Sequence, residues 1–518
     1  MSFKRNPGGP ARDSKTKTGG ESEEHNPAVR ACRKSDEAIV VKKPANKMAP
    51  VAMAESVERR ASAKGNPTTA PEVGTQSPTQ SEDGLVRIRA AARKDRTMRF
   101  NNLLHHLTVE RLWKAYEHLQ KRAAPGVDGI DWYRYGEALI QNLTELHRRL
   151  QTGRYRAQPV KREWITKPNG GQRALGITCV EDKIFQQALV WVLESIYEQD
   201  FLGFSYGFRP GRSQHDALDA LYMALTVKKV SYVLDTDIQG YYDHIDQNWL
   251  MRFLEHRIAD RRILELIKQT VQAGIVDAGQ WQRSEQGIPQ GAVISPLLSN
   301  IYLYYALDQW AHQWRERQAR GEVYLIRYAD DLIACFQYAR DGQAFHWELA
   351  QRLKRFNLKL HPGKTRLIEF GRFARDNRKK RGEGKPESFD FLGFTHVCAQ
   401  RRSDGGYTVR RITIAKRQRE KLKEVRQWLK RNRHLPIAVQ GRQIARIITG
   451  ALNYYGVPGN LAALNAFRTE ICKAWLWALR KRSHKAAKMS WDKFKRIVAE
   501  WVPKIRVIHP YPSERLHV

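Results

Sequence analysis

The sequence predicts an α+β protein with several domains, and three observations support this prediction. Short apolar runs rich in strand-forming residues occur at 230–234 and 324–336, and acidic residues follow or interrupt them. Apolar residues recur at helical spacing in the segments 86–150 and 401–512. The chain has 518 residues, which is long enough for several domains.

The segment 324–336 reads Tyr-Leu-Ile-Arg-Tyr-Ala-Asp-Asp-Leu-Ile-Ala-Cys-Phe and predicts a hairpin with Ala329, Asp330 and Asp331 at its tip. Two neighbouring carboxylates repel each other at such a tip. A divalent cation between them makes the pair favourable, because carboxylate oxygens are the ligands that Mg²⁺ prefers. An ordinary hairpin with a polar turn explains the Asp-Asp pair on its own equally well.

A third acid upstream favours the metal-binding interpretation. Asp237 follows the apolar run 230–234, and 93 residues separate it from Asp330. If this strand end lies beside the hairpin, three carboxylates surround a pair of metal ions about 4 Å apart, with Asp331 as the supporting ligand. Taken alone, Asp237 is more simply interpreted as a helix cap or a solvated strand end.

Three motifs in this order resemble those of reverse transcriptases. Residues 328–331 resemble the active-site tetrapeptide, and residues 235–246 resemble the first palm motif. Residues 287–303 resemble the second palm motif of group II intron reverse transcriptases, the intron-encoded maturases. The resemblance implies a right-hand polymerase fold of fingers, palm and thumb, with a helical N-terminal extension and a helical thumb or maturase domain. The two Mg²⁺ ions that it implies are assigned to Asp237, Ile238, Asp330 and Asp331.

Nucleotide-binding residues are expected near these motifs. The segment 164–173 predicts a hairpin with a glycine turn, whose two arms place the cations Lys167 and Arg173 to hold a triphosphate. The resemblance implies that Gln290 and Gly291 contact the incoming nucleotide and the template. It also implies that Tyr242 excludes a 2′-hydroxyl and that Lys364 protonates the leaving pyrophosphate. A loop-to-helix junction, a core aromatic and a surface lysine are the simpler alternatives for these positions.

The expected domain organisation follows composition and the resemblance together. Residues 371–388 are expected to be a flexible loop, and one side of the amphipathic stretch 414–434 holds Leu422, Val425 and Leu429. The expected domains are a disordered tail at 1–85, a helical extension at 86–150, fingers at 151–228, a palm at 229–400 and a thumb or maturase domain at 401–518.

Basic residues predict where RNA binds. Arg209 and Arg212 lie in a segment that resembles the family, and the residues alone leave open whether they contact template phosphates or brace the fingers. Arg480, Lys481 and Arg482 resemble the basic surface of the maturase domain. The formal net charge is +36, and residues 1–85 supply only +3 of it, so the expected folded part carries the charge that an anionic polymer requires.

Composition also excludes several classes of protein. The five cysteines are scattered without a Cys-x-x-Cys pair, so neither a zinc site nor a disulfide framework is indicated and a reducing cytoplasm fits. No run of 18 apolar residues occurs, so no membrane partner is expected. No His/Cys cluster follows the basic C-terminal segment, so the HNH endonuclease domain of some relatives is expected to be absent.

The function implied by the resemblance is that of a bacterial RNA-directed DNA polymerase encoded by a group II intron, which copies intron RNA into cDNA and assists splicing and mobility. Its expected partners are group II intron RNA, an RNA template with a DNA primer, dNTPs and target DNA. One alternative is a free-standing reverse transcriptase of a retron, a diversity-generating element or a defence system. The other is an RNA-binding maturase that only assists splicing.

Overall fold

The computed structural model describes residues 79–166, 171–282 and 286–512. Its first described element is helix α2 (Thr79–Lys94), so the chain is already helical before residue 86, where composition predicts that the disordered tail ends. Helix α6 packs against both α2 and α3. The other helices of this region are η1 (Leu104–His106), α3 (Val109–His118), α4 (Trp132–Gly136), α5 (Leu139–Gln151) and α6 (Val180–Tyr197).

A first sheet has the strand order β2-β1-β4-β5. Strands β1 (Val160–Thr166) and β2 (Gln172–Ile177) form an antiparallel pair, with Ile165 opposite Arg173. This confirms the hairpin expected at 164–173, whose turn lies outside the described residues. The short strands β4 (Ile275–Asp277) and β5 (Gln280–Gln282) complete the sheet.

A second, central sheet has the order β6-β7-β3-β8, and its neighbouring strands are antiparallel. Strands β6 and β7 are the predicted hairpin, in which Tyr328 pairs with Asp331 across the two-residue turn Ala329-Asp330. Strand β3 lies beside β7, and Thr236 pairs with Leu332. The bounds are β3 (Tyr232–Thr236), β6 (Val323–Tyr328), β7 (Asp331–Phe336) and β8 (Arg366–Glu369).

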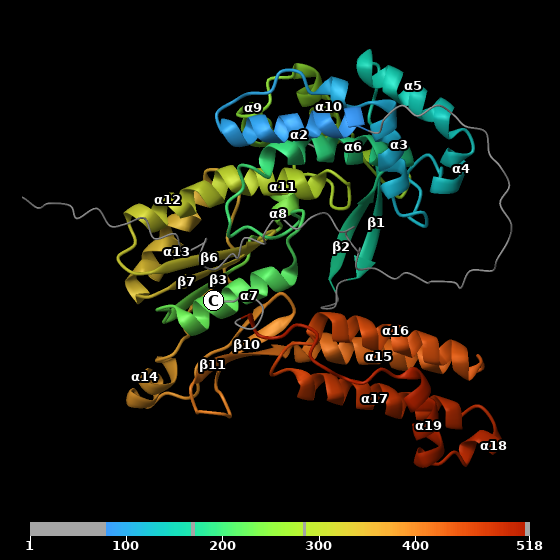
Figure 1. The fold of residues 1–518 in the computed structure, drawn as a ribbon, viewed down its shortest axis with the longest axis vertical. Coiled ribbons are helices and arrows are strands. Elements are labelled where there is room, and N and C mark those ends of the chain that lie inside the picture. Colours follow the sequence, from blue (N-terminus) through green and yellow to red (C-terminus); the bar gives the residue numbers. More distant parts are fainter. Residues whose placement is uncertain (1–78, 167–170, 283–285, 513–518) are drawn as a thin grey trace, which may run out of the picture. The chain divides into compact units, whose positions relative to one another are not determined.

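Side chains alternate across the two faces of the central sheet, as strand geometry requires. Leu234, Leu332 and Phe336 belong to one buried cluster with Phe345 of α13 (Ala339–Lys354). Val233, Ile333 and Cys335 belong to another cluster with residues of α7 (Gln214–Val227). The sheet is therefore covered by helices on both faces, and Figure 1 shows α7 and α13 on its opposite sides.

Helices connect β3 to β6 and join the larger buried cluster. Helix α11 begins next to Pro296, as predicted, because proline is tolerated in the first turn of a helix. One turn of π-helix, η2, continues α11 into α12. The bounds are α8 (Tyr241–His244), α9 (Gln247–Glu255), α10 (Arg261–Gln272), α11 (Ser295–Leu303), η2 (Tyr304–Asp308) and α12 (Gln309–Arg317).

A third sheet and a C-terminal group of helices follow. The sheet order is β11-β10-β9, formed by β9 (Phe389–Phe391), β10 (Phe394–Gln400) and β11 (Tyr407–Thr413). The segment before it contains helix α14 (Ala374–Lys380), so the prediction of a flexible loop at 371–388 is wrong. Leu422, Val425 and Leu429 are buried in a separate core, which confirms the amphipathic stretch. The C-terminal helices are α15 (Ala415–Arg431), α16 (Ile437–Tyr455), α17 (Leu461–Arg480), α18 (His484–Ala487) and α19 (Trp491–Trp501).

Among the described residues, none of the helices combines the length and the apolar character needed to cross a bilayer.

Candidate active site

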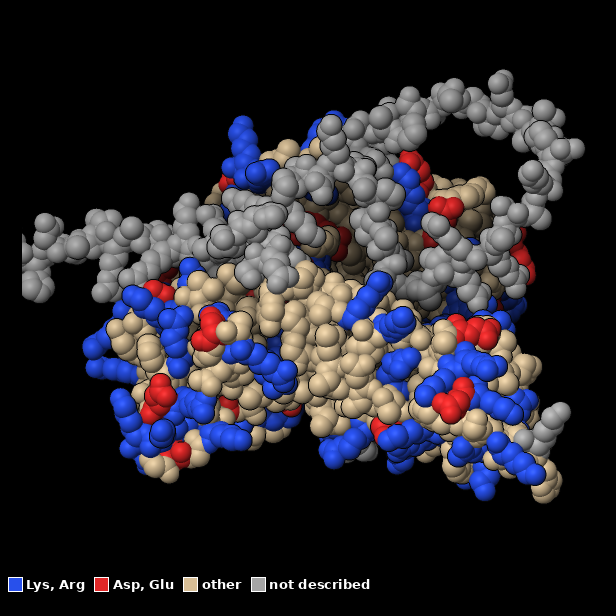
Figure 2. All heavy atoms as spheres, turned by 60° about the horizontal axis from the view of Figure 1, so that its bottom comes forward, with Lys and Arg blue, Asp and Glu red and all other residues tan. Residues whose placement is uncertain are grey.

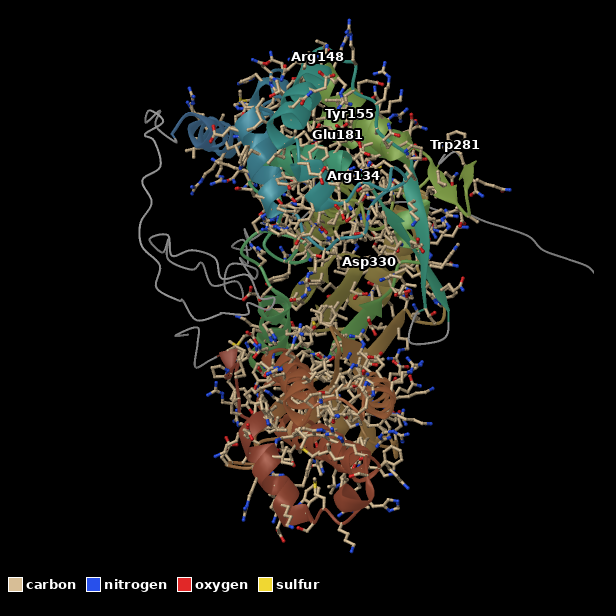
Figure 3. The ribbon with its side chains drawn as sticks, turned by 90° about the vertical axis from the view of Figure 1, so that its right-hand side faces the viewer. Arg134, Arg148, Tyr155, Glu181, Trp281 and Asp330 are labelled. Atoms are coloured by element: carbon tan, nitrogen blue, oxygen red, sulfur yellow. The ribbon has the colours of Figure 1, made fainter. Side chains whose placement is uncertain are left out.

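The turn that carries Asp330 is held from inside the protein by Arg327, which is fully buried. The guanidinium of Arg327 donates to the carboxylate of Asp308, with Nη2 2.5 Å from Oδ2, and to the Ala329 carbonyl at 2.8 Å. It also donates to Asn300 Oδ1 at 3.0 Å and to Ser205 Oγ at 2.7 Å. Figure 3 shows Asp330 at the end of the central strands, where this network fixes the turn.

The segment that contains Ser205 also supports the turn through its backbone. The amide of Tyr206 donates to the Arg327 carbonyl at 2.8 Å, and Asn300 Nδ2 donates to the Gly207 carbonyl at 2.7 Å. A Cβ atom on Gly207 would lie 2.3 Å from the Ala329 amide nitrogen, so only glycine fits here without a shift of the backbone. Ala329 itself has a φ of +56°, a conformation that costs about 1 kcal/mol or more for a residue with a side chain.

The three predicted acids lie on adjoining strand ends. Asp237 follows β3, Asp330 lies in the turn, and Asp331 begins β7, the neighbour of β3. Burial raises the pKa of Asp330 above its usual range, and the Asp237 carboxylate adds to this shift. Desolvation by the surrounding groups and the negative charges of Asp330 and Asp237 together raise the pKa of Asp331 to about 7, although the residue as a whole is exposed. The carboxyl groups therefore act on one another electrostatically, and cations would relieve their repulsion.

A cavity of about 430 Å³ opens beside these acids. Its lining includes Asp237 and Asp331, and two further acids that sequence reasoning missed, Asp235 and Asp390. Burial raises the pKa of Asp235 to about 6, and the nearby Asp390 and Asp237 contribute to the shift. The Asp-x-Asp spacing of residues 235 and 237 was a usable signal, because alternate residues of a strand share one face.

Lys364 supplies a cation to this cavity. Its Nζ donates to Asp237 Oδ2 at 2.9 Å, although the lysine side chain is 60% exposed. Backbone contacts hold the surrounding segment, since the amide of His361 donates to the Asp237 carbonyl at 2.7 Å. The predicted residue is thus an ion-pair partner of a predicted metal ligand.

Hard oxygen donors that repel one another are the chemistry that a divalent cation requires. The side chain of Ile238 is a hydrocarbon without donor atoms, so this residue could bind a metal only through its backbone carbonyl. Within the described residues, no three Asp, Glu, His or Cys side chains approach closely enough to form a metal centre. The donor set fits a divalent ion, but the carboxylates have to move together to hold it.

Two of the predicted nucleotide-binding residues, Gln290 and Gly291, lie in the loop before α11. The Gln290 carbonyl accepts a hydrogen bond from the Gly176 amide of β2, at 2.5 Å. Gly291 has a φ of +108°, and a Cβ there would lie 2.7 Å from both the Gly176 carbonyl and a Leu175 methyl group. Gln290 also lines a cavity of about 350 Å³ between this loop and the first sheet.

Tyr242 and Arg173 lie close enough to the acids to interact with them. Burial raises the pKa of Tyr242, and the charge of Asp330 contributes to the increase. Arg173 acts in the opposite direction on the pKa values of both Tyr242 and Asp330. Tyr242 is partly buried, with its hydroxyl 3.4 Å from Ser299 Oγ, whereas Tyr241 is a core residue that donates to the Ser299 carbonyl. Lys167 lies outside the described residues.

The two arginines predicted to bind RNA near residue 210 are bound within the protein. Arg209 is 7% exposed and contacts Glu198 at 3.0 Å and the carbonyls of Leu202 and Ser205 at 2.8 Å. The donors of Arg209 face the protein interior, which favours the bracing alternative over a contact with template phosphates. Arg212 is half-buried and donates to the Gly203 carbonyl at 2.7 Å, which also favours the bracing alternative.

The C-terminal cations are on the surface. Arg480, Lys481 and Arg482 are all exposed at the end of α17. Arg480 donates to the Met489 carbonyl at 2.7 Å, and Arg482 donates to the His434 carbonyl at 3.3 Å. Because these three residues are exposed, RNA can reach them, and the RNA contact stays a prediction.

Comparison with known proteins supports the resemblance. Residues 165–396 match the family described as reverse transcriptase (RNA-dependent DNA polymerase). Protein YkfC of Escherichia coli is 37% identical over 238 residues, covering 40% of this chain and 62% of that protein. The group II intron-encoded protein LtrA of Lactococcus lactis is 37% identical over 178 residues, covering 33% of this chain and 28% of LtrA. An uncharacterized 91 kDa protein in the cob intron of Schizosaccharomyces pombe is 35% identical, covering 33% and 21%.

The matched family and the names of these relatives confirm the predicted resemblance to group II intron reverse transcriptases. The alignments span from about a fifth to three fifths of the length of these relatives. The matched region includes β2, the central sheet and the loop before α11, so all described parts of the candidate site lie within it.

Proposed function

We propose that this chain, whose residues 165–396 match the reverse transcriptase family, is an RNA-directed DNA polymerase encoded by a group II intron. In this proposal the central sheet with its helices is the palm, residues 229–400. Strands β1 and β2 with the neighbouring helices supply the fingers, residues 151–228. The helices α15–α19 form the thumb or maturase domain, and α2–α5 form the N-terminal extension.

The single observation that supports this proposal most strongly is the turn at Asp330. A fully buried Arg327 and a glycine without room for a Cβ hold two acids beside the end of β3, which carries a third. Like charges packed in this way oppose folding unless a ligand uses them, so we infer that this arrangement serves phosphoryl transfer.

Each candidate residue then has a role in nucleotide addition. Asp237, Asp330 and Asp331 would hold two divalent ions, with Mg²⁺ as the proposed metal, whose charge would activate the primer 3′-hydroxyl and offset the charge of the phosphates. Arg173 and Lys167 bind the triphosphate as cations. Lys364 brings an ammonium group to the acids, where it neutralises or protonates the leaving pyrophosphate.

The loop before α11 and Tyr242 define the nucleotide pocket in this proposal. Gly291 allows the backbone to approach β2 closely, so that Gln290 is held at the cavity between the loop and the first sheet. Tyr242 presents a partly buried ring near Asp330, where an aromatic floor excludes a ribose 2′-hydroxyl and favours dNTPs.

A splicing role is proposed for the same chain, with group II intron RNA as the partner. The support is the name of LtrA and the exposed cations at the end of α17. The chain would then also bind an RNA template with its DNA primer and the target DNA. A free-standing reverse transcriptase would share the polymerase but lack the intron RNA as a specific ligand.

Primer extension with purified protein tests the polymerase. We expect wild-type protein to extend a DNA primer on an RNA template with dNTPs and Mg²⁺. Asp330→Asn should lower the rate by at least about 10²-fold, because it removes a charge that the transition state requires. Asp492→Asn is the matched control, since Asp492 is 84% exposed on α19. A wild-type protein that extends no primer but binds intron RNA would favour the splicing-only alternative.

A further inference from the structure

The segment between β8 and β9 is more ordered than its composition predicts, and it is strongly basic. Residues 371–388 contain seven Lys and Arg against three Asp and Glu. The side chains on one side of α14 bind acids: Asn377 donates to Glu369 at 2.9 Å, and Arg378 lies 3.3 Å from Glu383. Arg381 joins both of these glutamates, at 2.5 Å and 2.7 Å. This network anchors α14 to the end of the central sheet, because Glu369 ends β8.

The other side of α14 presents cations that no described residue neutralises through an ion pair. Arg375, Lys379, Lys380 and Lys385 are exposed, and none of them makes a hydrogen bond or ion pair with another described residue. Arg375 and Lys379 are four residues apart, so they lie on the same face of the helix. Phe373, next to this face, is 58% exposed. Figure 2 shows Lys and Arg gathered on the side of the molecule where α14 lies in Figure 1.

A cavity of about 210 Å³ lies between this segment and the third sheet. Arg372 and Arg375 line it, together with the carboxylate of Asp376 and the partly buried Tyr407 of β11. The two guanidinium groups outweigh the single carboxylate, so the cavity has a net positive charge that suits a phosphate of an RNA backbone.

This surface is separate from the candidate active site. Strand β8 runs antiparallel to β3, with Glu369 opposite Tyr232 and Arg366 opposite Asp235. Helix α14 follows Glu369, so it begins at the end of the sheet away from Asp237. Glu369, next to α14, and Arg366, beside Asp235, are three residues apart along β8, which corresponds to roughly 10 Å.

We propose that the α14 surface, defined as Arg372, Arg375, Lys379, Lys380 and Lys385, binds the phosphate backbone of a folded RNA outside the catalytic cavity. The ion pairs on the inner side fix the helix in advance, so RNA binding requires little ordering of the protein. This proposal rests on the proposed function, because it assigns a second contact to the RNA that the polymerase uses. Its partner is RNA rather than protein, since the exposed groups are cations spaced along a helix.

The test compares the triple variant Arg375→Ala, Lys379→Ala, Lys380→Ala with wild type in binding a folded group II intron RNA at several salt concentrations. We expect affinity at about 0.1 M salt to fall at least about tenfold and the slope of log Kd against log salt to fall by about 2 to 3, because three phosphate contacts are lost. Primer extension on a short RNA–DNA hybrid should remain unchanged, which also shows that the variant is folded.

A control with the same loss of charge is Lys114→Ala, Arg148→Ala, Lys495→Ala. Each of these exposed cations is already paired with an acid on its own helix. An equal loss of affinity in both variants, or unchanged affinity in the α14 variant, would overturn the proposal. If wild-type protein extended no primer, the polymerase assignment would fail, and the binding comparison would still decide the role of α14.

Discussion

The residue that best explains the geometry of the candidate site is Arg327, which lies only three positions before Asp330. It is one of 90 Lys and Arg residues, and although it lies in an apolar run, its neighbours in the sequence do not identify the groups that it binds. Its role depends on Asp308, 19 residues away on η2, and on Ser205, 122 residues away. The sequence therefore predicts the acids that would perform the chemistry but not the buried cation that positions them.

Breaking the Arg327–Asp308 ion pair should lower the stability of the protein strongly. Arg327→Met leaves the fully buried Asp308 carboxylate without its partner, and the free energy of unfolding should fall by about 3–5 kcal/mol. The double variant Arg327→Met, Asp308→Leu removes both charges and should regain much of that stability. Its primer extension should stay low, because the Ala329 carbonyl and Asn300 still lack their donor. Urea unfolding and primer extension measure the two effects separately, and recovery of both together would contradict a positioning role.

Glu194 is a partly buried acid of α6 whose effect on the free energy of unfolding depends on pH. Burial raises its pKa to about 7, and the neighbouring Glu198 adds to the shift. A glutamate whose pKa is higher in the folded than in the unfolded state favours folding while it is protonated. This contribution is complete below about pH 4.5 and is lost as the pH rises through about 7.

Glu194→Gln should therefore stabilise the protein at pH 8, by an amount of order 1–3 kcal/mol, and should differ little from wild type near pH 4.5. Thermal unfolding across this range measures the difference. Glu198→Gln is the contrasting variant one turn away. It should destabilise the protein, because Glu198 binds the buried Arg209 at 3.0 Å. A stability difference for Glu194→Gln that does not change with pH would contradict this explanation.

At the scale of elements, hairpins and amphipathic helices follow from sequence patterns. The helix that the sequence did not predict, α14, is held by ion pairs with residues outside it. The hairpin at 324–336 and the apolar face of α15 are local properties, and the structure confirms both. Helix α14 was missed because its composition is typical of a flexible loop. Its order comes from Glu369 on β8 and from Glu383, which bind the inner arginines across the sequence.

The close packing of the segment 204–207 against the β6–β7 turn gives a prediction at this scale. Gly207→Ala places a Cβ 2.3 Å from the Ala329 amide nitrogen, so the turn or the segment has to move. Primer extension should fall by at least about tenfold, since small misplacements of catalytic groups are costly. Binding of folded RNA should persist because the cations are elsewhere.

Gly450→Ala is the control for that change. A Cβ on Gly450 of α16 meets no atom within 4 Å, so alanine should be neutral or slightly stabilising. Equal activity of the two variants would show that the turn tolerates displacement and would contradict the role given to Gly207.

At the scale of the whole molecule, the charge distribution makes a prediction about RNA binding. Residues 1–78 contain 14 Lys and Arg against 9 Asp and Glu, a net of +5 out of the +36 of the chain. The remaining charge lies almost entirely on the described residues, including the α14 surface and the end of α17. Since phosphate contacts determine the salt dependence of RNA binding, that dependence should belong to the described part of the chain.

A variant that lacks residues 1–78 tests this directly. Its affinity for folded intron RNA should stay within about threefold of wild type, and the slope of log Kd against log salt should change by less than about 1, the contribution of one phosphate contact. Primer extension should be retained, because the acids and the buried network around Arg327 lie far along the chain. A loss of several units of slope would instead assign the RNA contacts to the deleted residues. The mixture of 14 cations with 9 acids in this segment argues against that outcome. The acids offset much of the positive charge, which weakens the attraction to RNA phosphates.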